Sequence, residues 1–219
     1  MKIRSIPAVL SLIVFLSLLS CSSSHRGVII ACMGDSLTES SYPRHLLKTL
    51  AREGVRAKII NFGRSGFTSG EYLNYLEKNQ PAIAAAQPDF ILVQLGTNDV
   101  RIDHDRTSKE QFFSNMKNIL GILSQLKNPE GKKTRILLAT IPPIPLETPF
   151  PFSSDSQRRV MSEINPVIFQ IGKEQKISIV DNYTVFIESP QFLPEVHPTE
   201  EGYKLLAGNW FVALKPLLK

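Results

Sequence analysis

Five short, largely apolar runs constrain what this chain can fold into more than any other feature. They span residues 28–33, 57–62, 90–95, 135–140 and 177–180. Such runs are typical of strands buried on both faces of a parallel sheet. Segments with helical spacing lie between and after them, at 41–53, 70–86, 109–127, 156–174 and 199–218. This alternation predicts a three-layer α/β/α sandwich with a five-stranded parallel sheet in a flavodoxin-like arrangement.

Prolines are expected to interrupt two of the helices and to stiffen one loop. We expect a break at Pro81 and another near Pro166, because proline lacks the N–H that a helix interior needs. Residues 141–154 combine five prolines with apolar side chains. This segment follows the fourth run, at the edge of the sheet where ligands bind. It is either a rigid loop packed on the domain or a wall of a substrate pocket.

The amino-terminal segment has the pattern of an export signal. A short basic start containing Lys2 and Arg4 precedes an apolar run from Ile6 to Leu19, shorter than the ~20 residues of a spanning helix. Ser20 before Cys21 resembles a bacterial lipoprotein signal, which implies lipidation of Cys21 and a membrane-anchored location in the cell envelope. We therefore expect a signal peptide at 1–20, a tether at 21–27 and one domain at 28–219. An ordinary signal peptide and an uncleaved anchor are the alternatives.

Charge and cysteine content exclude several classes of protein. The chain has 25 basic and 20 acidic residues, and loss of residues 1–20 removes two basic ones, which leaves +3. The basic residues are dispersed, and the small clusters at Lys132–Lys133 and Arg158–Arg159 predict solvated surface, so no nucleic-acid partner is expected. Two cysteines exclude a disulfide scaffold, and Cys32 within an apolar run is expected to be buried.

A serine follows the first apolar run directly. In the segment Gly34-Asp35-Ser36-Leu37, Ser36 is expected at a strand-to-helix turn, which can expose its hydroxyl and provide backbone N–H groups to receive an oxyanion. Asp-Ser is also a good helix N-cap pair, so the segment alone is a weak signal. Asp35 and Asp99 are expected to be structural hydrogen-bond acceptors in their turns.

Three further blocks make the signal specific. Residues 61–68 follow the second run, residues 96–99 follow the third, and residues 197–199 stand near the carboxyl terminus. Together with residues 34–37, and in this order, they resemble the SGNH hydrolase superfamily, also called the GDSL esterases and lipases. The resemblance covers about residues 28–215. It implies the SGNH hydrolase fold and ester hydrolysis with no metal and no organic cofactor.

The resemblance implies a role for each matching residue. Ser36 matches the nucleophile, and His197 matches the general base that takes its proton. The backbone N–H groups of Gly66 and Ser36 and the side-chain amide of Asn98 match the oxyanion hole. Ester hydrolysis builds negative charge on one oxygen, and each preorganised donor is worth about 3–4 kcal/mol.

The third member of the triad departs from the family pattern. An Asp usually stands three residues before the histidine, whereas this chain has Pro194 there and Glu195 one residue later. Glu195 is therefore one candidate for the triad acid. Asp181, at the end of the fifth run, is another, and a Ser–His dyad without an acid is the third reading. Loss of the acid weakens control of the His197 tautomer.

The remaining histidines suggest no site. His45 stands between Arg44 and Lys48 on a helix and is expected to be solvated, and His104 between two aspartates is not expected to bind a metal. The expected function is that of a serine esterase acting on an acylated glycan or another small acyl ester. A lysophospholipase or thioesterase is the alternative, and a non-catalytic envelope protein that binds a glycan or a partner is the rival from another class.

Overall fold

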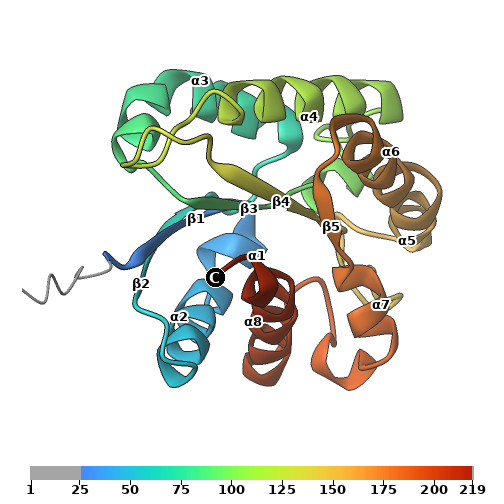
Figure 1. Cartoon of the computed structure of the whole chain (residues 1–219). Coiled ribbons are helices and arrows are strands. Elements are labelled where there is room, and N and C mark those ends of the chain that lie inside the picture. The colour runs from blue at the N-terminus through green and yellow to red at the C-terminus, as the bar shows by residue number, and fades with distance from the viewer. Residues whose placement is uncertain (1–25, 219) are drawn as a thin grey trace, which may run out of the picture.

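The computed structural model describes residues 26–218, so the predicted signal peptide, Cys21 and most of the tether lie outside the described residues. Five parallel strands form one sheet in the order β2-β1-β3-β4-β5, the flavodoxin-like order (Figure 1). The strands are β1 Val28–Gly34, β2 Ala57–Gly63, β3 Phe90–Gln94, β4 Arg135–Ala139 and β5 Ser178–Val180. All five follow the predicted runs, because each buries apolar side chains between two layers of helices.

Helices cover both faces of the sheet, and α3 and α4 lie opposite α2 and α8 (Figure 1). The helices are α1 Ser36–Glu39, α2 Tyr42–Arg52, α3 Ser69–Ala85, α4 Lys109–Leu123, α5 Ser154–Arg159, α6 Asn165–Gln175, α7 Asn182–Ile187 and α8 Glu200–Leu214. Shorter turns are η1 Asn98–Val100, η2 Val160–Ile164, η3 Pro190–Phe192 and η4 Lys215–Leu217. The three-layer prediction is confirmed. No helix within residues 26–218 has both the length and the apolarity needed to cross a membrane.

Alternate residues of β1 face the two helical layers. Ala31 and Met33 pack with the core under α3, α4 and α6, whereas Cys32 packs with the core under α2 and α8. Cys32 is fully buried, as predicted, and burial raises its pKa to about 12. This thiol is therefore protonated near neutral pH and inert.

The predicted break at Pro81 is wrong. α3 continues through Pro81 to Ala85. Proline in a helix interior costs about 3 kcal/mol. Tyr72, Leu76 and Ile83 are buried on both sides of it, and burial of such side chains stabilises the helix by about 1.5–3 kcal/mol each. Packing against the sheet thus outweighs the local defect.

The second predicted interruption is confirmed. The helical segment widens into a π-helical turn at Val160–Ile164 before α6 begins. Pro166 then lies in the first turn of α6, where its missing N–H is not needed. π-helical turns inside helices often mark functional sites.

Candidate active site

The carboxyl edge of the sheet brings the sequence blocks together. β1 lies between β2 and β3, so the loops that follow these three strands are neighbours. Ser36 comes after β1, Gly66 after β2 and Asn98 after β3. His197 comes from the loop between η3 and α8. Four residues predicted to act together are thus supplied by four segments that meet at one edge.

A glycine places the serine. Gly34 ends β1 with φ +156°, and a Cβ on this residue would lie 1.9 Å from the carbonyl oxygen of Gln94. Only glycine lets β1 end this close to β3. Asp35 then caps α1, and its Oδ1 accepts a hydrogen bond from the Leu37 N–H at 3.0 Å. Ser36 is therefore the first residue of a helix, where backbone N–H groups have no partner within the helix.

His197 faces the serine. Its Nε2 lies 2.9 Å from Ser36 Oγ, within the reach that a general base requires. Thr199 anchors the histidine loop, because its N–H donates to the Phe192 carbonyl at 2.9 Å and its Oγ1 accepts from Gly202 N at 3.1 Å, which caps α8. The loop is thus fixed on both sides of the imidazole.

Neither candidate acid contacts the imidazole. Glu195 is exposed, and within residues 26–218 it makes no hydrogen bond and no ion pair. Asp181 instead caps α7, accepting from Thr184 N at 3.1 Å and from Thr184 Oγ1 at 2.7 Å, and it also accepts from Thr140 Oγ1 at 3.0 Å. Burial raises the pKa of Asp181, but these hydrogen bonds outweigh it and hold the pKa below its ordinary value.

The two loops predicted to supply oxyanion donors are tied to each other. Gly66 has φ +79°, in the left-handed region that favours glycine. Asn98 is buried, and its Nδ2 donates to the carbonyl oxygen of Phe67 at 3.0 Å. The side-chain amide has two hydrogens, so one remains for a substrate oxygen. Asn98 thereby fixes Phe67, the residue next to Gly66, and still has one N–H that can donate to a ligand.

Asp99 reinforces this link from below. Its carboxylate accepts from the Ser69 backbone N–H at 2.9 Å and from Ser69 Oγ at 2.5 Å, and Asn115 Nδ2 donates to the same hydroxyl at 3.0 Å. Burial raises the pKa of the Asp99 carboxyl, although the hydrogen bonds from Ser69 oppose the shift. The structural role expected for Asp99 is thus confirmed, and Ser69 and Asn115 were not anticipated.

The prediction that Arg158 and Arg159 are both solvated is wrong for Arg159. Its side chain is 1% exposed, whereas that of Arg158 is 57% exposed, so only Arg158 is solvated. Arg159 Nη1 donates to the Asp99 carbonyl at 2.9 Å, Nη2 donates to the Thr107 carbonyl, and Nε pairs with Glu163 at 2.7 Å. The four-residue spacing of Arg159 and Glu163 on a helix could have predicted their ion pair. The contacts with the carbonyls of Asp99 and Thr107 could not be predicted from a local pattern, because these residues lie far away in the sequence.

Asp35, next to Ser36 in the chain, lies in a buried polar cluster. It is fully buried, and burial together with the nearby Asp99 charge raises its pKa to about 7. Its Oδ2 has no hydrogen-bond partner among the described residues, nor do the hydroxyls of Thr38 and Thr97. Its Oδ1 caps α1, which confirms the structural role expected for Asp35.

The prediction of a solvated His45 is wrong. His45 is buried, and its Nε2 lies 2.9 Å from Glu200 Oε1. The reason is tertiary, because α2 packs against α8 and covers that face of the helix. Asp103 and Asp105 both pair with Arg101. Among residues 26–218, no three His, Cys, Asp or Glu side chains are grouped to hold a metal ion.

The proline-rich loop is both packed and pocket-lining. Its first residues, 141–144, are buried, whereas Leu146 and Phe150 are exposed. A cavity of about 300 Å³ lies between this loop and the α7–η3 segment. Its lining is largely apolar and consists of Pro143, Ile144, Pro145, Glu147, Gln157, Phe186, Ile187, Pro190, Leu193 and Pro194. It adjoins the segment that carries His197.

Residues 32–205 match the GDSL-like Lipase/Acylhydrolase family. An acetylxylan esterase of Xylanibacter ruminicola is 27% identical in an alignment of 209 residues that covers 85% of this chain and 43% of that protein. A GDSL esterase/lipase of Oryza sativa is 25% identical in an alignment of 180 residues that covers 73% of this chain and 66% of that protein. This chain thus spans less than half the length of the first relative and about two thirds of the second.

Solved structures share the fold. A lipase/acylhydrolase from Enterococcus faecalis has a TM-score of 0.70 at 24% identity, covering 88% of this chain and 97% of its own. An acetyl-xylooligosaccharide esterase from Geobacillus, solved as a mutant, has a TM-score of 0.64 at 20% identity, covering 85% and 94%. At these identities the likeness concerns the fold alone.

Proposed function

Because this chain belongs to the GDSL-like lipase/acylhydrolase family, we propose that it cleaves carboxylic esters through an acyl-enzyme formed on Ser36. The observation that carries this proposal is the 2.9 Å approach of His197 Nε2 to Ser36 Oγ. A serine hydroxyl is a weak nucleophile unless a base accepts its proton. His197 is the one titratable group that contacts this hydroxyl within residues 26–218.

The reaction has two halves in this proposal. Ser36 Oγ attacks the acyl carbon while His197 Nε2 takes the proton, and the carbonyl oxygen becomes an oxyanion facing Ser36 N–H, Gly66 N–H and the free hydrogen of Asn98 Nδ2. His197 then returns the proton to the leaving alcohol, which departs and leaves an ester on Ser36. A water attacks the acyl carbon while His197 takes its proton, the bond from that carbon to Ser36 Oγ breaks, and His197 returns the proton to Oγ as the acid is released.

We propose a Ser36–His197 dyad, in which His197 acts as the base without a carboxylate partner. Glu195 makes no contact with the imidazole, and Asp181 is engaged in capping α7. An imidazole without an acid partner loses part of its tautomer control, but the oxyanion donors still contribute to the rate. The Asp99–Ser69 hydrogen bonds and the Asn98 link to Phe67 favour preorganised donors.

For the substrate, we propose an acetylated glycan. The acetylxylan esterase relative supports this choice, and His197 is exposed at the carboxyl edge, where a polymer has access. The test is a series of p-nitrophenyl esters of increasing chain length beside acetyl-xylooligosaccharides. An activity confined to acetate, with acetate released from the oligosaccharide, supports deacetylation.

One observation favours a second candidate. The apolar cavity of about 300 Å³ beside the His197 segment has room for a longer acyl chain. A lysophospholipase or thioesterase with an optimum of eight carbons or more would use it. The same ester series separates the two candidates, because a rate that rises with chain length excludes a strict deacetylase.

For location, we propose an exported lipoprotein held to a membrane of the cell envelope by lipid on Cys21. The apolar run from Ile6 to Leu19 and the Ser20–Cys21 pair support this. Metabolic labelling with a palmitate analogue tests it. Label on the wild-type chain but not on a Cys21→Ser variant is expected, and label on neither would leave the anchor without support.

A further inference from the structure

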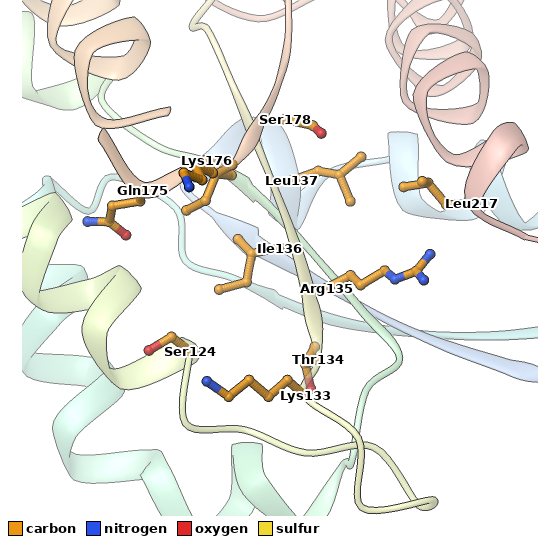
Figure 2. Close-up of a pocket in the computed structure, with 11 residues that line it drawn as sticks. Ser124, Lys133, Thr134, Arg135, Ile136, Leu137, Gln175, Lys176, Ser178 and Leu217 are labelled. Carbon is orange, nitrogen blue, oxygen red and sulfur yellow. The ribbon is translucent and has the colours of Figure 1, made fainter. Parts of the chain in front are cut away.

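A second cavity lies at the amino edge of the sheet, opposite the Ser36 edge. It encloses about 510 Å³ near the starts of β4 and β5 and the ends of α4 and α6. Figure 2 shows Ser124 and Lys133 on one side of it and Gln175 and Lys176 on another, while Arg135 extends across the far side of β4. Its lining contains three basic residues and no acidic one.

The three cations of this cavity have no counter-charge. Lys133, Arg135 and Lys176 are all exposed, and within residues 26–218 none of them forms an ion pair. Some other surface cations are paired, as Arg158 is with Asp155 and Lys204 is with Glu201. Isolated lysines such as Lys48 and Lys78 also form no ion pair within residues 26–218, so what sets the three cavity cations apart is that they line one hollow without a carboxylate. Three unpaired cations around one hollow create a positive potential that an anionic partner would neutralise.

The two edges of the sheet carry opposite charge. The loops leading into the strands and following α8, with the first residue of β4, contain eight basic residues, Arg26, Arg56, Lys127, Lys132, Lys133, Arg135, Lys176 and Lys215. They contain three acidic residues, Glu53, Asp89 and Glu130. The loops that follow the strands, together with those after α7 and η3, contain six acidic residues that reach the surface, Asp103, Asp105, Glu147, Asp181, Glu188 and Glu195, besides the buried Asp35 and Asp99. They contain three basic ones, Arg64, Arg101 and Arg106.

The chain also enters the domain at the basic edge. All five strands are parallel, so Val28 at the start of β1 lies at the same edge as Arg135 at the start of β4. Residues 1–25, with the apolar run at 6–19, connect there. An attachment through that segment would therefore join the domain at its basic edge rather than at the Ser36 edge.

We propose that this basic edge, centred on the cavity at Lys133, Arg135 and Lys176, docks onto the anionic phospholipid headgroups of a bilayer. The phosphates neutralise the three unpaired cations, and the acidic edge points away from the surface. Ser36 and His197 then face outward, toward substrates that are not part of the membrane. Docking is independent of the ester that the enzyme cleaves, so either proposal can fail without the other.

Lysine footprinting on the full-length protein tests the orientation. The protein is reconstituted with vesicles of phosphatidylcholine, alone or with 30% phosphatidylglycerol, and acetylated briefly before mass spectrometry. We expect Lys133 and Lys176 to be protected about threefold or more on the anionic vesicles only, since each basic residue near an anionic surface is held there electrostatically. Lys48 and Lys78, exposed on α2 and α3, serve as internal controls and should react equally on both.

Charge reversal gives a matched comparison. The difference between the two vesicle types is then read at Lys127, an exposed lysine in the loop before β4 that both variants retain. The variant Lys133→Glu, Arg135→Glu, Lys176→Glu should lose this difference, whereas Lys48→Glu, Lys78→Glu, Lys109→Glu, with the same net charge, should keep it. Circular dichroism and the melting temperature show whether both variants fold. Equal protection on both vesicle types would overturn the proposal. So would protection by inorganic phosphate without vesicles, which would indicate a small-anion site.

Discussion

The guanidinium of Arg159 donates from Nη1 to the main-chain oxygen of Asp99 at 2.9 Å, one residue beyond the predicted oxyanion donor Asn98. Through Nη2 it also holds the carbonyl of Thr107 at the far end of the same loop. The buried side chain of Arg159 thus binds both ends of the loop that carries Asn98. Its third contact, Glu163, belongs to the π-helical turn.

The contacts of Arg159 with the Asn98 loop can be tested by replacing its side chain. Arg159→Met leaves two buried carbonyls and Glu163 without their donor, so we expect the free energy of unfolding to fall by about 3–5 kcal/mol. In protein that remains folded, kcat should fall at least tenfold with little change in KM, because the role proposed for Asn98 is to stabilise the transition state rather than to bind substrate. Arg158→Met, at the exposed neighbour, should change stability by at most about 1 kcal/mol. Equal kinetics for the two variants would refute a positioning role.

The nucleophile is tested by Ser36→Ala. We expect ester turnover to fall by about 10³-fold or more with an unchanged melting temperature, because no other hydroxyl contacts His197 within residues 26–218. A fluorophosphonate probe should label the wild-type chain and not the variant. Ser65→Ala, an exposed serine in the neighbouring loop, is the control. Persistent labelling of the Ser36 variant would show that another residue is the nucleophile.

The dyad assignment predicts a small effect at Glu195. Since Glu195 makes no contact with His197, Glu195→Gln should change kcat by less than about threefold. Asp181→Asn should lower stability by about 1 kcal/mol, because it weakens the cap of α7, with a similarly small effect on kcat. A loss of a hundredfold or more in the Glu195 variant would mean that this carboxylate reaches the imidazole during turnover.

The buried carboxyl of Asp35 predicts an unusual pH dependence of stability. Its pKa is about 7 in the folded chain and near 3.8 in an unfolded one, so the folded state binds more protons between these values. Stability from this group is therefore full below about pH 4 and declines as pH rises toward 7, by about 4 kcal/mol in all.

The Asp35→Asn substitution removes this pH-dependent contribution to stability while keeping an acceptor for the Leu37 N–H. Thermal unfolding of both proteins at pH 5 and pH 8 measures it. The melting temperature of the variant, relative to that of the wild type, should be higher at pH 8 than at pH 5. The exposed Glu195→Gln variant should show no such pH-dependent gain. An identical difference at the two pH values would be incompatible with titration of Asp35.

The turn before the serine predicts a severe steric effect. Gly34→Ala places a methyl group 1.9 Å from the Gln94 carbonyl oxygen at φ +156°, so β1 and β3 must separate, and we expect no folded protein or a loss of several kcal/mol. Gly208→Ala in α8 meets no atom within 4 Å and should stabilise the helix by about 0.5–1 kcal/mol. Circular dichroism during urea titration compares the two. A well-folded Gly34→Ala variant would show that the strand ends are not held this tightly.

Local pattern alone determined the sheet and its active edge. Apolar runs at strand length, together with polar blocks directly after them, are local signals, and parallel strands necessarily gather their carboxyl ends at one edge. The positions of Ser36, Gly66 and Asn98 on neighbouring loops follow from that rule, and the structure also places His197 against Ser36.

Tertiary structure decided which side chains are covered and what they touch. Arg159 is buried by carbonyls 52 and 60 residues away, and His45 by a carboxylate 155 residues away, so neither environment was visible in its own segment. Packing of α3 on the sheet overrode the helix-breaking preference of Pro81. The separation of Glu195 from the imidazole likewise depends on the path of the whole histidine loop. Burial and contact are properties of distant segments brought together, and a linear pattern carries no record of them.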